Sequence, residues 1–161
     1  MPIYKKAVYT GTFDPFTNGH QNIVERSLKY FDELTVLVAV SPTKGPLFSM
    51  SERVQMLQEI FKNHEKIKVD SYSGLVVDYA KEHNIGSLIR GLRPTGDFEK
   101  EFQMASMNNQ LDNQLETIFL MTASEHYFIS SSLVKEVFIH GGDVKKFVPK
   151  LILKKLQEKI G

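Results

Sequence analysis

The feature that most constrains the fold is an apolar run from Leu34 to Val40, in which only Thr35 is polar. Runs rich in β-branched residues are typical of a strand buried on both faces of a parallel sheet, whereas a hairpin strand alternates apolar and polar residues. Parallel neighbours must be joined by crossover segments, which are usually helices. The run therefore predicts an α/β protein built on a parallel sheet.

Strand-like and helix-like patterns alternate along the rest of the chain. We expect strands at 7–9, 34–40, 67–71, 87–89 and 116–121, and helices at 18–30, 49–61, 75–83, 97–109, 132–139 and 149–160. No repeat or long linker divides the chain, so residues 1–161 are expected to form a single domain. The prediction is one doubly wound, five-stranded parallel sheet with helices on both faces. Its ligand crevice should lie beyond the carboxyl ends of the strands.

Composition narrows the function classes. The chain is 42% apolar and 24% charged, with a formal net charge of +1, whereas proteins that hold nucleic acid through its phosphates are strongly basic. The absence of cysteine excludes disulfides, thiolate metal sites and cysteine nucleophiles. No signal-like segment is evident, and no apolar run approaches the ~20 residues that cross a bilayer. We therefore expect a cytoplasmic protein with neither a nucleic-acid nor a membrane partner.

A glycine turn joins the first predicted strand to the first predicted helix. Gly11 follows the strand, and Thr17-Asn18-Gly19-His20 opens the helix. The start of a helix carries about half a positive charge and binds phosphate through free backbone N–H groups. His20 falls in the first turn, where its ring could donate to the same phosphate. The segment predicts a nucleoside triphosphate site with its own catalytic histidine, although it contains neither of the common glycine-rich phosphate motifs.

Other phosphate-binding side chains follow the remaining strands. Lys44 lies in the loop after the second strand, Arg90 and Arg93 flank Gly91 after the fourth, and Ser130–Ser132 precede a helix after the fifth. Cations, hydroxyls and glycines are the groups that surround phosphates in proteins. Two arginines at the end of a buried strand also require an anionic partner. Because parallel strands end at one edge, these loops predict a shared anion-binding pocket.

Each of these residues also has a purely structural interpretation. An isolated His20 would more often cap a helix, and Lys44 could be an ordinary loop lysine. One or more of Ser130–Ser132 could serve only as a helix cap. Met104 and Met107 are more typical of a core than of a substrate pocket.

Longer blocks resemble a known family. Residues 17–20 and 129–134 are similar to the paired signature of the nucleotidyltransferase superfamily, which has a Rossmann-like fold. The blocks at 11–15, 41–44, 88–93, 97–99 and 128–136 resemble the bacterial phosphopantetheine adenylyltransferase family, in the same order over nearly the whole chain. The sequence departs from the family where His126 replaces a common tryptophan and Thr10 a common proline.

The resemblance implies an activity. An enzyme of this family transfers the adenylyl group of ATP, carried with Mg²⁺, to 4′-phosphopantetheine, and releases dephospho-coenzyme A and pyrophosphate. It also implies a homohexamer and feedback binding of coenzyme A. Two alternatives stay open: an adenylyl- or cytidylyltransferase for another phosphorylated acceptor, and a non-catalytic nucleotide sensor.

The resemblance also implies the roles of individual residues. His20, Lys44 and Thr12 would be catalytic, and no protein cluster that ligates a metal is expected. Thr12, Lys44, Val76 and Arg90 would hold the pantetheine substrate, with Met107 and Asn108 on the helix beside it. The ATP site would comprise Thr12, Phe13, His20, Gly91, Leu92, Arg93, Glu101, His126, Tyr127, Phe128, Ile129, Ser130, Ser131 and Ser132.

Overall fold

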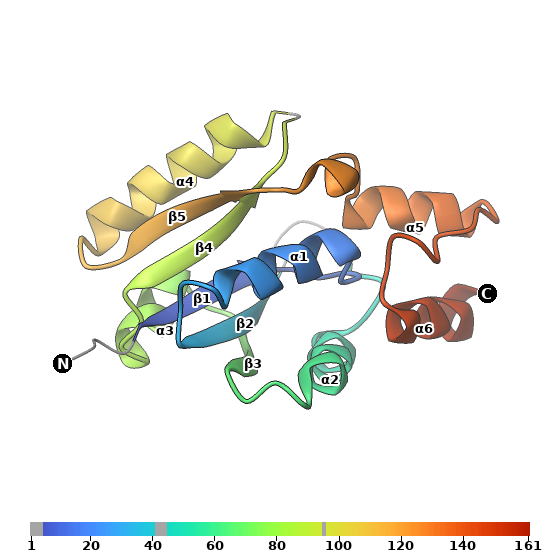
Figure 1. The fold of residues 1–161 in the computed structure, drawn as a ribbon, viewed down its shortest axis with the longest axis horizontal. Coiled ribbons are helices and arrows are strands. Elements are labelled where there is room, and N and C mark those ends of the chain that lie inside the picture. The colour runs from blue at the N-terminus through green and yellow to red at the C-terminus, as the bar shows by residue number, and fades with distance from the viewer. Residues whose placement is uncertain (1–4, 41–44, 95) are drawn as a thin grey trace.

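A computed structural model describes residues 5–40, 45–94 and 96–161. Five parallel strands form one sheet in the order β3-β2-β1-β4-β5 (Figure 1). Their bounds are β1 Lys6–Gly11, β2 Glu33–Ala39, β3 Ile67–Tyr72, β4 Ser87–Leu92 and β5 Glu116–Met121. The predicted five-stranded parallel sheet is confirmed. The chain order reverses beside β1, so the β1–β4 boundary is the topological switch point where ligands bind in such sheets.

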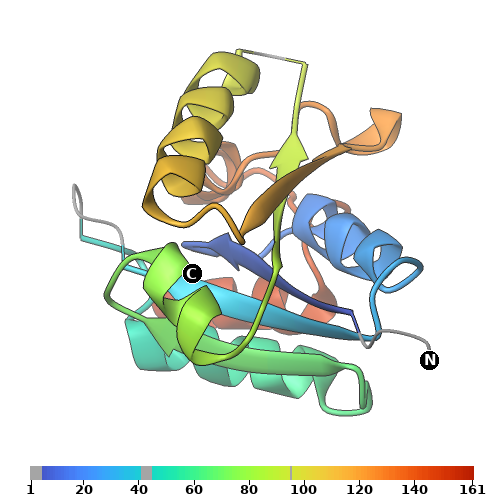
Figure 2. The ribbon, with the colours of Figure 1, turned by 90° about the vertical axis from the view of Figure 1, so that its left-hand side faces the viewer.

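Helices connect the strands and cover both faces of the sheet, as predicted. They are α1 Asn18–Ser27, α2 Met50–Phe61, α3 Val76–Glu82, α4 Asp97–Leu111, α5 Ser131–Ile139 and α6 Lys150–Ile160, with a 3₁₀ turn η1 at Ser124–His126. Figure 2 shows α1 on one side of the sheet and α3 and α4 on the other. Helix α2 begins with the expected capping box, because the Ser49 hydroxyl accepts from the Glu52 N–H and the Glu52 carboxylate accepts from the Ser49 N–H.

Two apolar cores explain the unbroken hydrophobicity of β2. Leu34, Val36 and Val38 pack in the larger core with α1, α2, α5 and α6, whereas Leu37 packs in the smaller one with α3. Successive side chains of a strand point to opposite faces, so a strand covered on both sides needs apolar residues throughout. Burial of each such side chain stabilises the fold by roughly 1.5–3 kcal/mol.

Several element boundaries differ from the expectation by two or three residues. Helix α1 ends at Ser27 rather than Tyr30, because the chain then tightens into turns in which the N–H groups of Lys29 and Tyr30 donate three residues back. Strand β1 continues to Gly11 because β2 pairs with it along its whole length. Strand β4 continues through Leu92 because β5 pairs with its last three residues. Arg90 and Gly91 therefore lie on a strand, which fixes their positions better than a loop would.

Candidate active site

A cavity of about 430 Å³ opens where β1 and β4 end. Its size is typical of a small-molecule site, and it lies at the switch point of the sheet. Residues from the β1 loop, α1, β4, α4 and the start of α5 line it: Tyr9, Thr10, Gly11, Thr12, Phe13, Thr17, Gly19, His20, Ile23, Arg90, Gly91, Arg93, Gly96, Asp97, Lys100, Glu101, Thr122, Ile129, Ser130, Ser131 and Ser132. Segments distant in the sequence thus meet in one pocket.

The structure brings most of the expected site residues together. Those that line the cavity are Thr12, Phe13, His20, Arg90, Gly91, Arg93, Glu101, Ile129, Ser130, Ser131 and Ser132. Val76, Leu92, His126, Tyr127 and Phe128 do not line it. Lys44 lies outside the described residues. Sequence reasoning did not assign Asp97 and Lys100 to the site, although their spacing from Glu101 places all three on one face of a helix.

The backbone around Thr17 fixes the hydrogen-bonding state of His20. The Thr17 N–H donates to Nδ1 of His20 at 3.0 Å, and the His20 N–H donates to the Thr17 hydroxyl at 3.3 Å, so the ring completes a capping box at the start of α1. Because Nδ1 accepts a backbone hydrogen bond, Nε2 carries the ring hydrogen. A neutral His20 is therefore held as a hydrogen-bond donor through Nε2.

Aromatic rings and arginines keep His20 uncharged. The ring centroids of Phe13 and Phe16 lie 5.1 Å and 5.4 Å from that of His20. Burial, together with the nearby positive charges of Arg93 and Arg90, lowers the pKa of His20 to about 3. The imidazole is therefore neutral at physiological pH. With so low a pKa it is too weak a base to act as an effective general base.

The turn after β1 positions these rings. A side chain at Gly11 would begin 2.9 Å from the Phe13 ring, so only glycine fits. Phe13 has a φ of 49°, a left-handed conformation that costs a non-glycine residue about 1–2 kcal/mol. Its buried ring meets Tyr9 edge-on at 5.4 Å and Phe16 at 5.5 Å, and this burial offsets that cost. Phe13 therefore supports His20 from the side.

Asp14 joins three segments around the pocket. Its buried carboxylate accepts from the N–H groups of Leu47 at 2.8 Å and Phe48 at 2.9 Å, and from the ammonium of Lys135 at 3.0 Å. These bonds tie the β1 turn to the chain before α2 and to α5. Arg53 adds a bond of 2.6 Å to the carbonyl of Thr12. Asp14 thus holds loops together rather than facing a ligand.

The two arginines of the pocket find their anionic partners on α4. Arg90 donates from Nε and a terminal nitrogen to Glu101 at 2.7 Å and 2.6 Å, and from its other terminal nitrogen to the Thr10 carbonyl at 2.6 Å. Arg93 donates to Asp97 at 2.8 Å and 3.3 Å. Two parallel N–H···O bonds fix the plane of a guanidinium group. The first two turns of α4 therefore orient both arginines.

Two helices begin at the cavity. Thr17, Gly19 and His20 at the start of α1 line it, as do Ser130–Ser132 at the start of α5. Ser130 is a helix cap whose hydroxyl accepts from the Leu133 N–H at 3.1 Å, and the Ser131 hydroxyl donates to the Pro15 carbonyl at 2.7 Å. Both helix starts favour anions, so the pocket suits phosphate groups.

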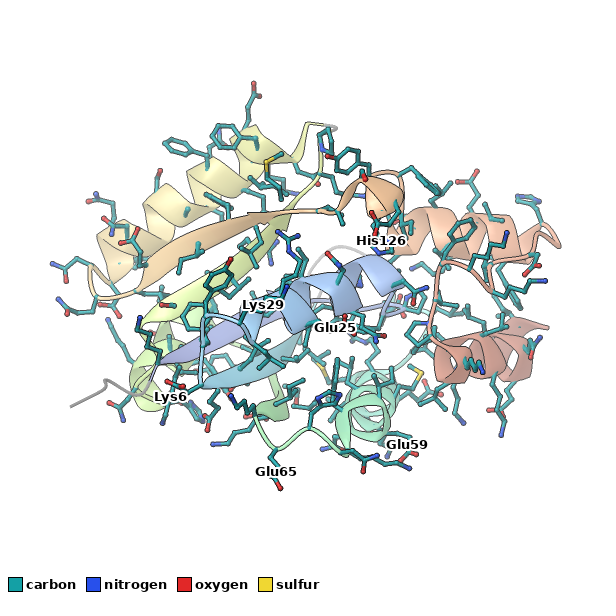
Figure 3. The ribbon with its side chains drawn as sticks, in the orientation of Figure 1. Lys6, Glu25, Lys29, Glu59, Glu65 and His126 are labelled. Atoms are coloured by element: carbon teal, nitrogen blue, oxygen red, sulfur yellow. The ribbon has the colours of Figure 1, made fainter. Side chains whose placement is uncertain are left out.

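His126 lies in η1 beside the start of α1, next to the cavity lining rather than in it (Figure 3). Its Cβ is 3.7 Å from where a side chain at Gly19 would begin. Among the described residues, its buried Nδ1 has no hydrogen-bond partner. His126 therefore packs against the first turn of α1 through its carbon atoms.

Residues 5–40, 45–94 and 96–161 contain neither a candidate metal cluster nor a candidate membrane span. Within these ranges no three histidine, cysteine, aspartate or glutamate residues are grouped so that they could hold a metal ion. The same ranges contain no helix with the length and apolar character that a membrane span requires. Both carboxylates that line the cavity, Asp97 and Glu101, are engaged by arginines.

Comparison with known proteins places the chain among nucleotidyltransferases. A family model described as cytidylyltransferase-like matches residues 8–137. The phosphopantetheine adenylyltransferase of Carboxydothermus hydrogenoformans is 52% identical over 153 residues, which cover 95% of this chain and 94% of that protein. Those of Desulfosudis oleivorans and Anaeromyxobacter dehalogenans are 46% and 45% identical over 157 residues, which cover 98% of this chain and 94% and 96% of those proteins.

Proposed function

The chain belongs to the phosphopantetheine adenylyltransferase family, and from this premise we propose that its pocket transfers the adenylyl group of ATP to 4′-phosphopantetheine. The products are dephospho-coenzyme A and pyrophosphate, so the enzyme serves coenzyme A biosynthesis. One observation carries the assignment of the pocket: the β1 turn, the end of β4 and the starts of α1 and α5 meet in a single cavity. These segments supply the helix N-termini and the arginines that can bind the phosphates of two substrates.

The reaction requires no covalent enzyme intermediate. A phosphate oxygen of 4′-phosphopantetheine, already ionised at neutral pH, attacks the α-phosphorus of ATP. The new P–O bond forms as the bond to pyrophosphate breaks, and no proton has to be removed from the nucleophile. Holding two anions in line is the main task, and good positioning lowers a barrier by roughly 7–11 kcal/mol.

His20 would stabilise the charge that develops on the α-phosphate. Its tautomer leaves Nε2–H as the donor, and burial keeps the ring neutral. Removal of one such preorganised donor typically costs about 2.7–4 kcal/mol of transition-state stabilisation. We assign His20 as the catalytic donor rather than as an acid or a base.

The acceptor phosphate would lie near Thr12, Lys44 and Arg90, with Val76 toward the pantetheine arm. Within the described residues, three of the five N–H groups of Arg90 are used by Glu101 and Thr10. The others can meet a phosphate without breaking the ion pair. Val76 lies outside the cavity lining, where the far end of a long substrate would reach.

ATP would occupy the other side of the cavity. Its proposed contacts are Thr12, Phe13, His20, Gly91, Leu92, Arg93 and Glu101 and the segment from His126 to Ser132. Leu92 and residues 126–128 lie outside the lining of the cavity, so we expect their contacts at its mouth. Mg²⁺ would arrive as part of the nucleotide substrate, because the two carboxylates of the pocket are already engaged by arginines.

We further propose a cytoplasmic homohexamer that binds coenzyme A as a feedback ligand. Helix α4 supports association, because it exposes Phe98, Phe102, Met104, Met107 and Leu111. Exposed apolar side chains in such number on one helix are typical of an interaction surface. Coenzyme A shares the adenylate and pantetheine parts of the product and would therefore fit the same pocket.

The test is to incubate the protein with ATP, Mg²⁺ and 4′-phosphopantetheine and to measure dephospho-coenzyme A and pyrophosphate. We expect the two products in equal amounts, and none when pantetheine without its phosphate replaces the acceptor. A panel of other phosphorylated acceptors tests the alternative transferase. ATP binding without turnover on any acceptor would contradict the proposal and favour a nucleotide sensor.

A further inference from the structure

Helix α4 presents a polar face to the pocket. Asp97, Lys100 and Glu101 line the cavity, while Phe98 and Phe102 are exposed. The spacing of three and four residues places the polar side chains on one face of the helix. The polar face includes a cation, Lys100, to which the proposed reaction gives no role.

The charges that line the cavity are partly cancelled by the protein itself. Glu101 pairs with Arg90 at 2.6 Å and Asp97 with Arg93 at 2.8 Å. His20 is neutral because burial lowers its pKa. Among the described lining residues, Lys100 is then the cation without a carboxylate partner. The surplus positive charge of this part of the pocket therefore rests on Lys100.

We propose that Lys100 is a substrate-binding residue that contacts a substrate phosphate. The inference rests on the proposed function, since it needs two anionic substrates in this cavity. The roles of the cations would then differ. The arginines are held in fixed planes by their carboxylates, whereas a lysine ammonium on a flexible stem can follow a phosphate group. Lys100 would thus contribute a mobile positive charge, whereas the arginines contribute hydrogen bonds of fixed direction.

The experiment compares Lys100→Gln, Lys100→Glu and Lys100→Arg with the wild type. Gln and Glu have nearly the same shape, so a difference between them isolates charge from packing. Lys29→Gln is the matched control, because Lys29 is an exposed lysine beyond the far end of α1 and outside the cavity lining (Figure 3). Calorimetry with ATP alone and with 4′-phosphopantetheine alone gives the Kd of each substrate, and turnover assays give the KM values and kcat.

We expect Lys100→Gln to raise the Kd and KM of one substrate by about tenfold, as loss of one charge-assisted hydrogen bond would. Lys100→Glu should raise them further, Lys100→Arg should restore most of the affinity, and kcat should change less than KM. High salt should narrow the difference between the wild type and Lys100→Gln. The substrate whose Kd rises identifies which phosphate Lys100 contacts.

Unchanged Kd values for both substrates in Lys100→Gln, or equal values for the Gln and Glu variants, would overturn the inference. So would a loss that the Lys29→Gln control shares. None of those results affects the turnover of the wild type, so the proposed function would not be contradicted by them. Absence of wild-type turnover would instead contradict the proposed function. Thermal unfolding of each variant separates lost binding from lost folding.

Discussion

At the scale of single residues, the pocket depends on a hydrogen bond from a backbone N–H group that sets the tautomer of His20. The Thr17 N–H satisfies Nδ1 of His20, and the same contact caps α1. The motif at residues 17–20 predicted a histidine at a helix start, but not its tautomer. The tautomer depends on Thr17 having an extended backbone conformation, which a sequence pattern does not specify.

We predict that His20→Ala lowers kcat by about 10²–10³, because the variant loses one preorganised donor. The affinity for ATP should change little, since that donor acts mainly on charge that develops in the transition state. Steady-state kinetics together with calorimetry for ATP measures both quantities. Near-full turnover in the variant would remove His20 from the mechanism.

His20 should also make the fold less stable in acid. Its pKa is about 3 in the folded protein, against an ordinary value of 6.5. As the pH falls below 6.5, the unfolded chain binds a proton at His20 that the folded chain does not bind. The contribution is therefore intact above pH 6.5 and is lost progressively as the pH falls toward 3.

Urea unfolding at several pH values measures this effect. We expect the free energy of unfolding of the wild type to fall more steeply below pH 6.5 than that of His20→Gln. The difference in slope should stay under about 1.4 kcal/mol per pH unit, the limit for one proton. Parallel curves for the two proteins would show that His20 does not titrate in this way.

At the scale of elements, the helices do more than connect parallel strands, because they also position side chains of the pocket. Helix α4 holds two arginines through Asp97 and Glu101 and also exposes the large apolar side chains of Phe98 and Phe102. The two arginines at the end of a strand indicated that an anionic partner was needed. The identity of the partner could not be predicted, because the ion pairs depend on how α4 packs against the extended β4.

Strand β4 illustrates a second limit of sequence reasoning. Arg90 and Gly91 have the character of a loop because neither favours a strand. They are held extended by pairing with Phe119 and Leu120 of β5. That pairing joins residues far apart in the chain, so it cannot be predicted from a local sequence pattern. The polar end of a ligand-binding strand is therefore easily taken for its loop.

The Asp14 carboxylate should contribute to the stability of the fold, because it accepts three hydrogen bonds that join separate segments. We predict that Asp14→Ala lowers the free energy of unfolding by about 2–4 kcal/mol, because two N–H groups and the Lys135 ammonium lose their acceptor in a buried place. Denaturant unfolding measures the change. The matched control is Asp143→Ala, which removes an exposed ion pair with Lys145 and should cost less than about 1 kcal/mol. Equal losses in the two variants would contradict the proposed role of Asp14.

At the scale of the whole molecule, the alternation of patterns was sufficient to predict a doubly wound parallel sheet, and the structure confirms it. The strand order and the switch point between β1 and β4 explain why distant segments meet. The convergence of the loops followed from this topology. The assignment of the individual site residues stays a prediction, and Lys44 lies outside the described residues.

Association is the corresponding prediction for the assembly. We expect the wild type to sediment as a hexamer and Phe102→Glu to sediment as smaller species, because the change places a charge among the exposed apolar side chains of α4, where Phe102 is 55% exposed. Tyr30→Glu, at another exposed aromatic residue, should leave the hexamer intact. A monomeric wild type at tens of micromolar protein would contradict the expected assembly.

We propose that the pocket aligns two anions for direct transfer, with no enzyme-bound intermediate. The most direct test uses ATP made chiral at the α-phosphorus by sulfur and oxygen isotopes, with 4′-phosphopantetheine as the acceptor. A single in-line displacement inverts the configuration at that phosphorus, so we predict inversion in the dephospho-coenzyme A product. Retention of configuration would require two displacements and would contradict direct transfer.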